Sequence, residues 1–304
     1  MSIPFVSFED GDGLLDWIGL TEALVAGHTA PKADIGDTFL YRDPDTLLSR
    51  AAFIDGLGVA VKSATVFPGN PGKGKPMIHG AVTLFSDEDG MPEALLDFHL
   101  VTKWKTAADS LLGARLLARP GSRRILLVGA GTVGRNLHNA YSTAFPEAHF
   151  SVWSRTSKSA ETLANACAIT PVYDLEAAVR DADIVACATM TTDPIIKGAW
   201  LQPGTHVDLI GAYRPDMREV DSAALQKARV FVDSFDTTLD HIGELKIPLA
   251  DGDIGRDHVL ADYYLMDRFK RESDAEITLF KNGGGAHLDL MTSRYIFERW
   301  RAAQ

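Results

Sequence analysis

The sequence predicts an α/β protein that contains a doubly wound parallel sheet and a second, α+β domain. From Arg124 onward, short uninterrupted apolar runs alternate regularly with helical segments. Apolar strands that alternate with helices are typical of a parallel sheet with both faces covered. A glycine-rich turn, Gly129 to Gly134, directly follows the first of these strands. Before residue 119, by contrast, strand-like and helical segments mix and turn signals are frequent.

The chain before residue 119 is expected to form an α+β domain built on antiparallel strands. Its predicted elements are a helix over 14–26, strands over 47–53, 58–66 and 81–85, and a helix over 102–119. Clusters of Pro, Gly and Asp separate the strands, as turns require. Pro120-Gly121 ends the last helix, and we place the domain boundary there.

The second domain is expected to begin at residue 120. Its predicted strands are 125–128, 149–153, 184–189, 206–210 and 230–232. Its predicted helices are 133–145, 158–168, 175–180 and 216–228, with Asp174 as an N-cap. The chain closes with a strand that starts at Ile277, a triple glycine and a long amphipathic helix that reaches Trp300.

Composition excludes several classes of function. The 304 residues are 46% hydrophobic, enough for two domains with cores of their own. The net charge of −11 argues against a nucleic-acid partner, because neutralising phosphates needs a basic surface. No segment approaches the roughly 18 apolar residues of a membrane span, and the N-terminus lacks a secretory signal. We therefore expect a cytoplasmic protein with no membrane partner.

The cysteines and acidic residues do not predict a metal site. Cys167 and Cys187 are the only cysteines and lack the spacing of a metal or redox motif. Cys187 lies in an apolar run, where a buried small hydrophobe is expected. The segment 240–244 contains Asp, His and Glu but lacks two ligands closely spaced on one helical face, so we expect no metal.

The glycine turn reads Gly129-x-Gly131-x-x-Gly134 between a predicted strand and a predicted helix. Gly129 permits a tight turn, Gly131 lets the backbone approach phosphates, and Gly134 allows close packing of helix and strand. The N–H groups at the helix start favour an anion. This order predicts a dinucleotide site, the alternative being an ordinary glycine-rich turn.

Further motifs follow in order along nearly the whole chain. They are Asp183-Ile184-Val185 before Ala188-Thr189, Leu201-x-Pro203-Gly204-Thr205-His206, the segment 210–219 with Arg214-Pro215-Asp216-x-Arg218-Glu219, and Ile277 to Asn282. Together with the glycine turn they resemble the ornithine cyclodeaminase/μ-crystallin family. The resemblance implies a homodimer whose substrate-binding and dimerisation domain is residues 1–119 completed by 286–304. It also implies a Rossmann domain over 120–285, and a nicotinamide cofactor acting on small α-imino or α-amino acids.

The choice of cofactor follows from the end of the second Rossmann strand. An NAD-selective site usually has an acid there, which binds the ribose 2′-hydroxyl. This chain has Ser154-Arg155-Thr156 instead, and Arg155 could pair with a 2′-phosphate. We expect NADP(H) to be preferred over NAD(H); a solvent-facing arginine is the alternative. The other expected cofactor contacts are Thr132, Val133, Thr189, Met190, Thr191, Gly211 and Asn282.

Three cations are candidates for holding a substrate carboxylate. The resemblance places Arg50, Lys62 and Lys105 at the family's carboxylate-binding positions, although an Arg is usual where Lys105 stands. Lysine keeps the charge but loses the planar, two-pronged geometry of arginine. Arg50 and Lys62 lie in predicted strands among apolar neighbours, where an inward cation is costly unless it is paired. A strand residue that faces solvent is the alternative for each.

Tyr213 is the second departure from the family pattern. Cyclodeaminases carry an Asp two residues after the position of Gly211, and this chain has Tyr213 there. Tyrosine, with a pKa near 10, is a poor base at neutral pH. The following Arg-Pro-Asp-x-Arg-Glu resembles the ketimine reductases of the family. We therefore list Tyr213 with the catalytic candidates Arg50, Lys62 and Lys105, a packing role being the alternative.

The resemblance thus implies an NADPH-dependent imine reductase in proline metabolism. The expected substrate is Δ1-pyrroline-2-carboxylate, reduced to L-proline, with Δ1-piperideine-2-carboxylate as a possible second substrate. The proton would come from Lys62 or an ordered water. The alternatives are an ornithine cyclodeaminase, an alanine-type amino acid dehydrogenase, and a crystallin-like nucleotide-binding protein without turnover.

Overall fold

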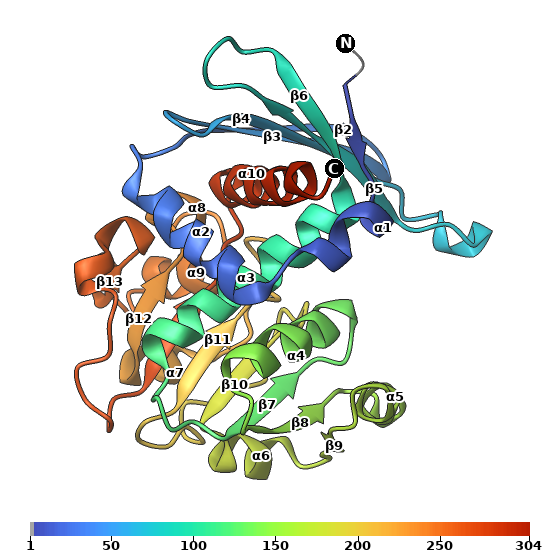
Figure 1. Ribbon diagram of the computed structural model, residues 1–304. Helices are drawn as coiled ribbons and strands as arrows, with labels where there is room; N and C mark the ends of the chain where they lie inside the picture. The colour runs from blue at the N-terminus through green and yellow to red at the C-terminus, as the bar shows by residue number, and fades with distance from the viewer. Residues whose placement is uncertain (1–2) are drawn as a thin grey trace. The chain divides into compact units, whose positions relative to one another are not determined.

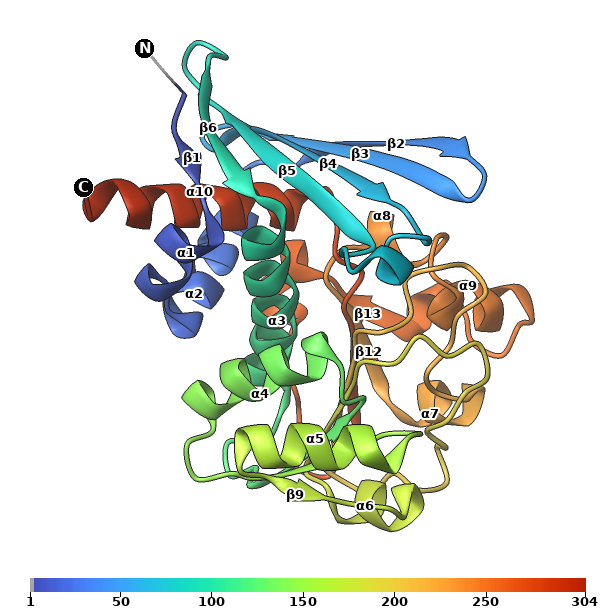
Figure 2. The ribbon, with the colours of Figure 1, turned by 90° about the vertical axis from the view of Figure 1, so that its right-hand side faces the viewer.

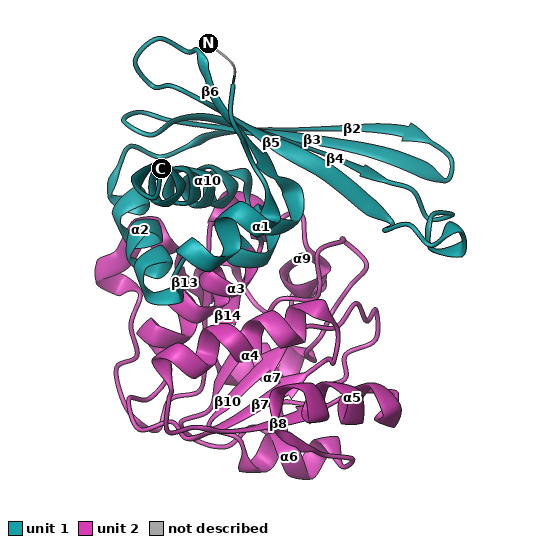
Figure 3. Ribbon diagram, turned by 45° about the vertical axis from the view of Figure 1, so that its right-hand side comes forward, with its two compact units in different colours: residues 1–105, 284–304 teal, residues 106–283 magenta. Residues whose placement is uncertain are grey.

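The computed structural model describes residues 3–304, which divide into two compact units. Unit 1 is the chain up to Lys105 together with Gly284–Gln304, and unit 2 is Thr106–Gly283 (Figure 3). Both ends of the chain therefore belong to unit 1. We expected one domain from 1–119 and 286–304, and a second from 120–285. The expected and observed ranges differ mainly over the second half of the helix α3 (Phe98–Leu117), which belongs to unit 2.

Unit 1 is built on a six-stranded sheet in the order β1-β6-β5-β4-β3-β2. All neighbours are antiparallel except β1 and β6, which confirms the predicted α+β class. The strands are β1 (Phe5–Val6), β2 (Asp34–Arg42), β3 (Asp45–Ile54), β4 (Gly58–Val66), β5 (Ile78–Phe85) and β6 (Pro92–Asp97). The predicted strand 58–66 is β4. The edge strand β2 was not predicted, because every one of its side chains is exposed and it carries no apolar period.

The helices of unit 1 are α1 (Phe8–Gly11), α2 (Trp17–Thr29) and α10 (Ala286–Ala302). Helix α10 lies along one face of the sheet, against β3, β4 and α2 (Figure 2). Burial alternates along β4, so Ala60, Lys62 and Ala64 share the buried face. The cation Lys62 therefore lies on the same covered face as apolar residues.

Unit 2 is an eight-stranded sheet in the order β13-β12-β14-β11-β10-β7-β8-β9, and every pair is parallel. Its strands are β7 (Arg124–Val128), β8 (His149–Trp153), β9 (Thr170–Pro171), β10 (Ile184–Cys187), β11 (His206–Leu209), β12 (Arg229–Val232), β13 (Val259–Ala261) and β14 (Thr278–Lys281). The chain runs outward from β7 through β8 to β9 and then returns to β10 on the other side of β7. This reversal is the switch point at which doubly wound sheets bind ligands.

Helices connect the strands of unit 2 (Figure 1); the first three were predicted, the fourth only in part, and the last two not at all. They are α4 (Thr132–Ala144), α5 (Ser157–Cys167), α6 (Leu175–Asp181), α7 (Ser222–Lys227), α8 (Phe235–Thr238) and α9 (Gly243–Ala250). Asp174 is the predicted N-cap, since its side chain accepts a bond from Ala177 N at 3.0 Å. The central strands β7 and β10 are apolar almost throughout, and Cys187 is fully buried in β10 as expected.

The predicted helix 216–228 is wrong in its first half. Helix α7 begins only at Ser222, with Asp221 as its N-cap. The residues before it are held by other backbone bonds: Arg218 N donates to Thr191 O, and Glu219 O accepts from Ile195 N and Ile196 N. Tertiary bonds to a neighbouring loop override the local helical pattern here.

None of the helices within residues 3–304 is long and apolar enough to cross a membrane.

Candidate functional site

The glycine turn connects β7 to α4 in unit 2. Gly129 has φ +116°, and a Cβ there would come within 2.7 Å of Ala188 O. A Cβ on Gly134 would overlap the carbonyl oxygen of Gly129. Gly131 is the N-cap of α4, whose first turn includes Thr132 and Val133, and it makes no side-chain capping bond. The N–H groups at the start of a thirteen-residue helix thus face the turn, which is the arrangement that binds a pyrophosphate.

Ser154, Arg155 and Thr156 follow β8 directly. Thr156 is the N-cap of α5 and makes no side-chain capping bond. Arg155 is exposed, and none of the described residues 3–304 forms an ion pair with it. Two hydroxyls and a guanidinium therefore stand together at the carboxyl end of the strand next to β7. This group suits a phosphate monoester.

The loops after β10 and β11 approach each other closely. Thr189, Met190 and Thr191 follow β10, and Gly211 follows β11. A Cβ on Gly211 would overlap the carbonyl oxygen of Thr189, so only glycine permits this approach. The carboxylate of Glu219 accepts hydrogen bonds from both loops.

Asn282 follows β14 and is buried. Its amide nitrogen donates to Thr106 O at 3.1 Å and to Ser110 Oγ at 3.0 Å, both on α3. An Asn amide has two N–H donors. Both donate to α3, so Asn282, an expected cofactor contact, has no N–H left to donate to the cofactor in this arrangement.

Arg50, Lys62 and Lys105 come together in unit 1. Arg50 on β3 lies opposite Lys62 on β4 in the sheet register. Arg50 Nη1 and Lys105 Nζ both donate to the carbonyl oxygen of Gly284, at 2.9 and 3.0 Å. Lys62 Nζ instead donates to Asp289 Oδ1 of α10 at 2.9 Å, in an ion pair that is almost wholly buried. The three residues thus form one cation cluster.

The cation cluster has an excess of positive charge. Its carboxylates are Asp289 and Asp37, the latter 2.6 Å from Arg50 Nη2. Burial lowers the pKa of Lys62 to about 8; Asp289 opposes this shift, while Lys105 and Arg50 add to it. Burial acts to raise the pKa of Asp289, but Lys62, Lys105 and Arg50 outweigh it and the pKa lies below its usual value. Three cations against two carboxylates favour the binding of an anion.

Tyr213 lies in unit 2, on the loop after β11, with 60% of its surface exposed. The adjacent Arg214 forms a two-pronged ion pair with Asp216, at 2.8 and 2.9 Å. Tyr213 is therefore an exposed residue of unit 2. Its assignment as a catalytic residue stays a prediction.

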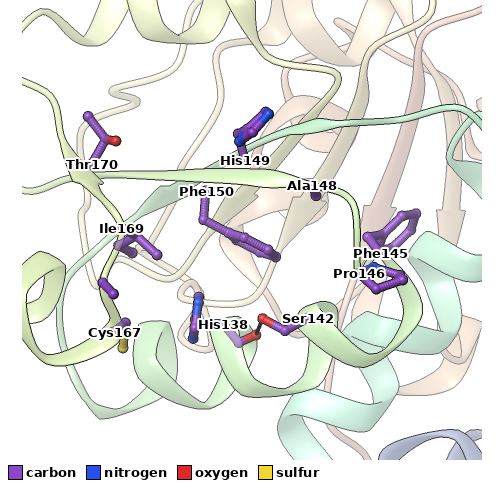
Figure 4. A pocket seen from close by; sticks show the side chains of 11 residues that line it. His138, Ser142, Phe145, Pro146, Ala148, His149, Phe150, Cys167, Ile169 and Thr170 are labelled. Carbon is purple, nitrogen blue, oxygen red and sulfur yellow. Dashed lines mark hydrogen bonds between the residues drawn. The ribbon is translucent and has the colours of Figure 1, made fainter.

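A cavity of about 310 Å³ in unit 2 contains none of the predicted site residues (Figure 4). It is lined by the last turns of α4, the start of β8 and the end of α5, including His138, Phe145 and Cys167. Dinucleotides bind at the carboxyl ends of parallel strands, and this cavity lies at the amino end of β8. It is therefore not the site that the glycine turn defines.

Sequence reasoning missed Asp289 and Glu244 as partners of the site, and assigned no role to Glu219. An acid in the first turn of a helix, such as Asp289, is ordinarily explained by the helix dipole. The only signal for Glu219 was its place at the end of the Arg-Pro-Asp-x-Arg-Glu motif. Nothing local marks Glu244.

The parallel sheet and the glycine turn define a dinucleotide-binding α/β protein of the Rossmann class. The model of the ornithine cyclodeaminase/mu-crystallin family matches residues 53–304, and the chain belongs to this family.

Similar proteins give the same assignment. The chain is 50% identical over 301 residues to a Δ1-pyrroline-2-carboxylate reductase of Paracoccus denitrificans, covering 96% of this chain and 95% of that one. A structure of Thermococcus litoralis Δ1-pyrroline-2-carboxylate reductase with NADH and L-proline matches with a TM-score of 0.90 at 26% identity, covering 99% and 98% of the chains. An archaeal alanine dehydrogenase dimer with bound NAD matches with a TM-score of 0.91 at 27% identity, covering 100% and 97%.

Proposed function

We propose that this protein reduces Δ1-pyrroline-2-carboxylate to L-proline with NADPH. It is an NAD(P)H-dependent imine reductase, as the relatives in its family indicate. The observation that carries the proposal is the cation cluster: three converging positive groups in unit 1 of a protein whose unit 2 carries a dinucleotide turn. The ring size of the substrate rests on the relatives, and Δ1-piperideine-2-carboxylate is proposed as a second substrate.

Arg50 and Lys105 bind the substrate carboxylate. Both donate to the Gly284 carbonyl oxygen, a neutral acceptor. A carboxylate adds the attraction between opposite charges, which a neutral carbonyl lacks, so a carboxylate can replace this carbonyl as their partner. Lysine in place of arginine at position 105 keeps the charge of this pair.

Lys62 donates the proton. When bound, NADPH supplies a hydride to the imine carbon, and a proton must reach the imine nitrogen to give the amine. With a pKa of about 8, Lys62 is protonated at neutral pH and yet acidic enough to transfer its proton. Asp289 holds the ammonium group in place at 2.9 Å.

NADPH is preferred over NADH because of Ser154, Arg155 and Thr156. The position that would carry an acid in an NAD site is occupied by a cation flanked by hydroxyls. Arg155 has no carboxylate partner among residues 3–304, so its guanidinium is available to a 2′-phosphate.

The protein acts as a homodimer through the sheet of unit 1. All side chains of the edge strand β2 are exposed, including Ile35, Phe39, Leu40 and Tyr41. Apolar side chains gathered on an unpaired edge strand mark an interaction surface. The alanine dehydrogenase with the same fold is a dimer.

A panel of substrates tests this function. The loss of NADPH absorbance is followed with Δ1-pyrroline-2-carboxylate, Δ1-piperideine-2-carboxylate, and keto acids with ammonia. Ornithine is tested separately with oxidised cofactor. We expect fast turnover with the cyclic imines only. Fast turnover of ornithine would favour a cyclodeaminase, turnover of pyruvate with ammonia an alanine dehydrogenase, and tight NADPH binding without any oxidation a crystallin-like protein.

A further inference from the structure

Glu219 is a fully buried carboxylate with hydrogen bonds to two separate loops of unit 2. Its Oε1 accepts from Thr189 N at 2.7 Å and from Thr189 Oγ1 at 3.0 Å. Its Oε2 accepts from Gly211 N at 2.7 Å and from Ala212 N at 3.2 Å. One side chain therefore satisfies donors of the loop after β10 with one oxygen and donors of the loop after β11 with the other.

A second layer of charged groups supports this carboxylate. The side chain of Glu244 accepts from Glu219 N at 2.7 Å and from Val220 N at 3.1 Å, which fixes the backbone that carries Glu219. Lys281 Nζ, also fully buried, donates to Leu209 O and to Asn282 O, at the ends of β11 and β14. Glu219 thus links the carboxyl ends of β10 and β11, and Lys281 links those of β11 and β14, while the charge of Lys281 also acts on both glutamates.

We propose that Glu219 is a positioning residue that holds the loops Thr189–Thr191 and Gly211–Ala212 in the arrangement that receives the nicotinamide half of the cofactor. This inference rests on the proposed function, because it takes these loops as cofactor contacts. The adenine half has its own elements, the glycine turn and Ser154–Thr156, which Glu219 does not touch. Loss of Glu219 therefore affects one half of the dinucleotide and spares the other.

Glu219→Gln is the informative substitution. A carboxamide has one oxygen and one NH2 group. Whichever way it is turned, the NH2 faces backbone N–H donors of one loop, so that loop loses its acceptor and meets a donor instead. Glu219→Asp keeps both acceptors but shortens the side chain, so it can reach only one loop well.

The experiment compares two ligands on each variant. NADPH spans both halves of the site, whereas 2′,5′-ADP carries only the adenine half and the 2′-phosphate. Dissociation constants are measured by calorimetry. For Glu219→Gln we expect NADPH to bind about tenfold weaker or worse, as the loss of buried hydrogen bonds to a charged group implies. The affinity for 2′,5′-ADP should stay within about twofold, and kcat should fall together with NADPH affinity.

Asp183→Asn is the matched control. Asp183 is a buried carboxylate of the same unit that also accepts two backbone bonds, from Arg123 N and Arg124 N. It precedes β10 at the amino end of this strand, whereas Glu219 bonds to the loop at its carboxyl end. The control should lower thermal stability and leave both dissociation constants unchanged.

Equal weakening of both ligands by Glu219→Gln would overturn the proposal, because it would show a general loss of structure. Unchanged NADPH affinity and unchanged kcat would overturn it as well. If Glu219→Gln does not fold, Glu219→Asp must show the same selective loss of NADPH binding, and equal effects on both ligands would then refute the proposal. Failure of the parent protein to bind either ligand would be a failure of the proposed function itself, which the parent measurement reveals before any variant is made.

Discussion

The ion pair between Lys62 and Asp289 allows the proposed catalytic role of Lys62 to be separated from its structural role. Lys62→Met keeps the apolar stem of the side chain but removes the charge. Asp289, which is 1% exposed, then loses its ion-pair partner at Oδ1. Its second oxygen, Oδ2, has no hydrogen bond even in the parent protein. Removal of one member of a buried ion pair costs about 3–5 kcal/mol of stability, because the other charge loses its partner. Lys105 and Arg50 still stabilise the Asp289 carboxylate, so we expect a loss toward the lower end of this range.

The double variant Lys62→Met/Asp289→Asn removes both charges at once. Its free energy of unfolding should recover most of that loss, since no unpaired buried charge remains. Its activity should not recover, because a general acid contributes typically 10²- to 10⁴-fold to the rate. We therefore expect the two variants to differ in stability and to share a loss of kcat/KM of about 100-fold or more, with NADPH affinity unchanged.

The assay combines urea denaturation with initial rates of imine reduction. In the parent, kcat/KM should fall as the pH rises through about 8, because Lys62 then loses its proton. The charged and titratable groups of this part of unit 1 are Arg50, Lys105, Asp289 and His287. The double variant should lack this decline. A double variant that reduces the imine as fast as the parent, with the same pH profile, would refute the reasoning and leave Lys62 a structural residue.

Three further predictions concern cofactor choice, substrate and acid stability. Arg155→Asp should shift the ratio of kcat/KM for NADPH to that for NADH toward NADH, since it replaces an ion pair by repulsion; equal efficiency with both cofactors in the parent would contradict this. Ornithine with oxidised cofactor should release negligible ammonia, and Tyr213→Asp alone should not create a cyclodeaminase because Lys105 remains; ammonia release comparable to imine turnover would show the Tyr213 argument to be wrong. Burial lowers the pKa of His28 to about 4, so below pH 6.5 the unfolded chain binds a proton that the folded chain does not bind. The free energy of unfolding should therefore fall by up to about 3 kcal/mol as the pH falls from 6.5 to 4. His28→Leu should reduce this decline in urea denaturation; an unchanged pH dependence would argue against it.

The elements that the sequence predicted best are the buried strands of unit 2. Residues 125–128 and 184–187 are continuous apolar runs because both faces of the parallel sheet are covered, and such runs are visible without any structure. The edge strand β2 and the short strand β13 were missed. An exposed edge strand has no buried face, and hence no period in its hydrophobicity.

The candidate site was predictable only where its residues are marked by type or by motif. The glycine turn is a local pattern, and Arg50, Lys62 and Lys105 came from the resemblance to the family. Glu219 and Asp289 act through partners 30 and 227 positions away in the sequence. A single sequence contains no signal for such long-range pairing, and a helix-like period even led to the wrong prediction for the backbone around Glu219.

The structure also gives the three cations of the cluster different partners. Arg50 and Lys105 share the Gly284 carbonyl, a neutral acceptor that a carboxylate outcompetes. Lys62 has a full negative charge as its partner, and exchanging that partner for a substrate carboxylate would leave Asp289 buried and unpaired at a cost of several kcal/mol. Carboxylate binding by Arg50 and Lys105 avoids this cost. Lys62 can then keep its bond to Asp289 and donate one of its two other N–H protons to the substrate. The partner of each cation thus supports its proposed role: Arg50 and Lys105 as anchors bonded to a replaceable carbonyl, and Lys62 as a proton donor held by a carboxylate.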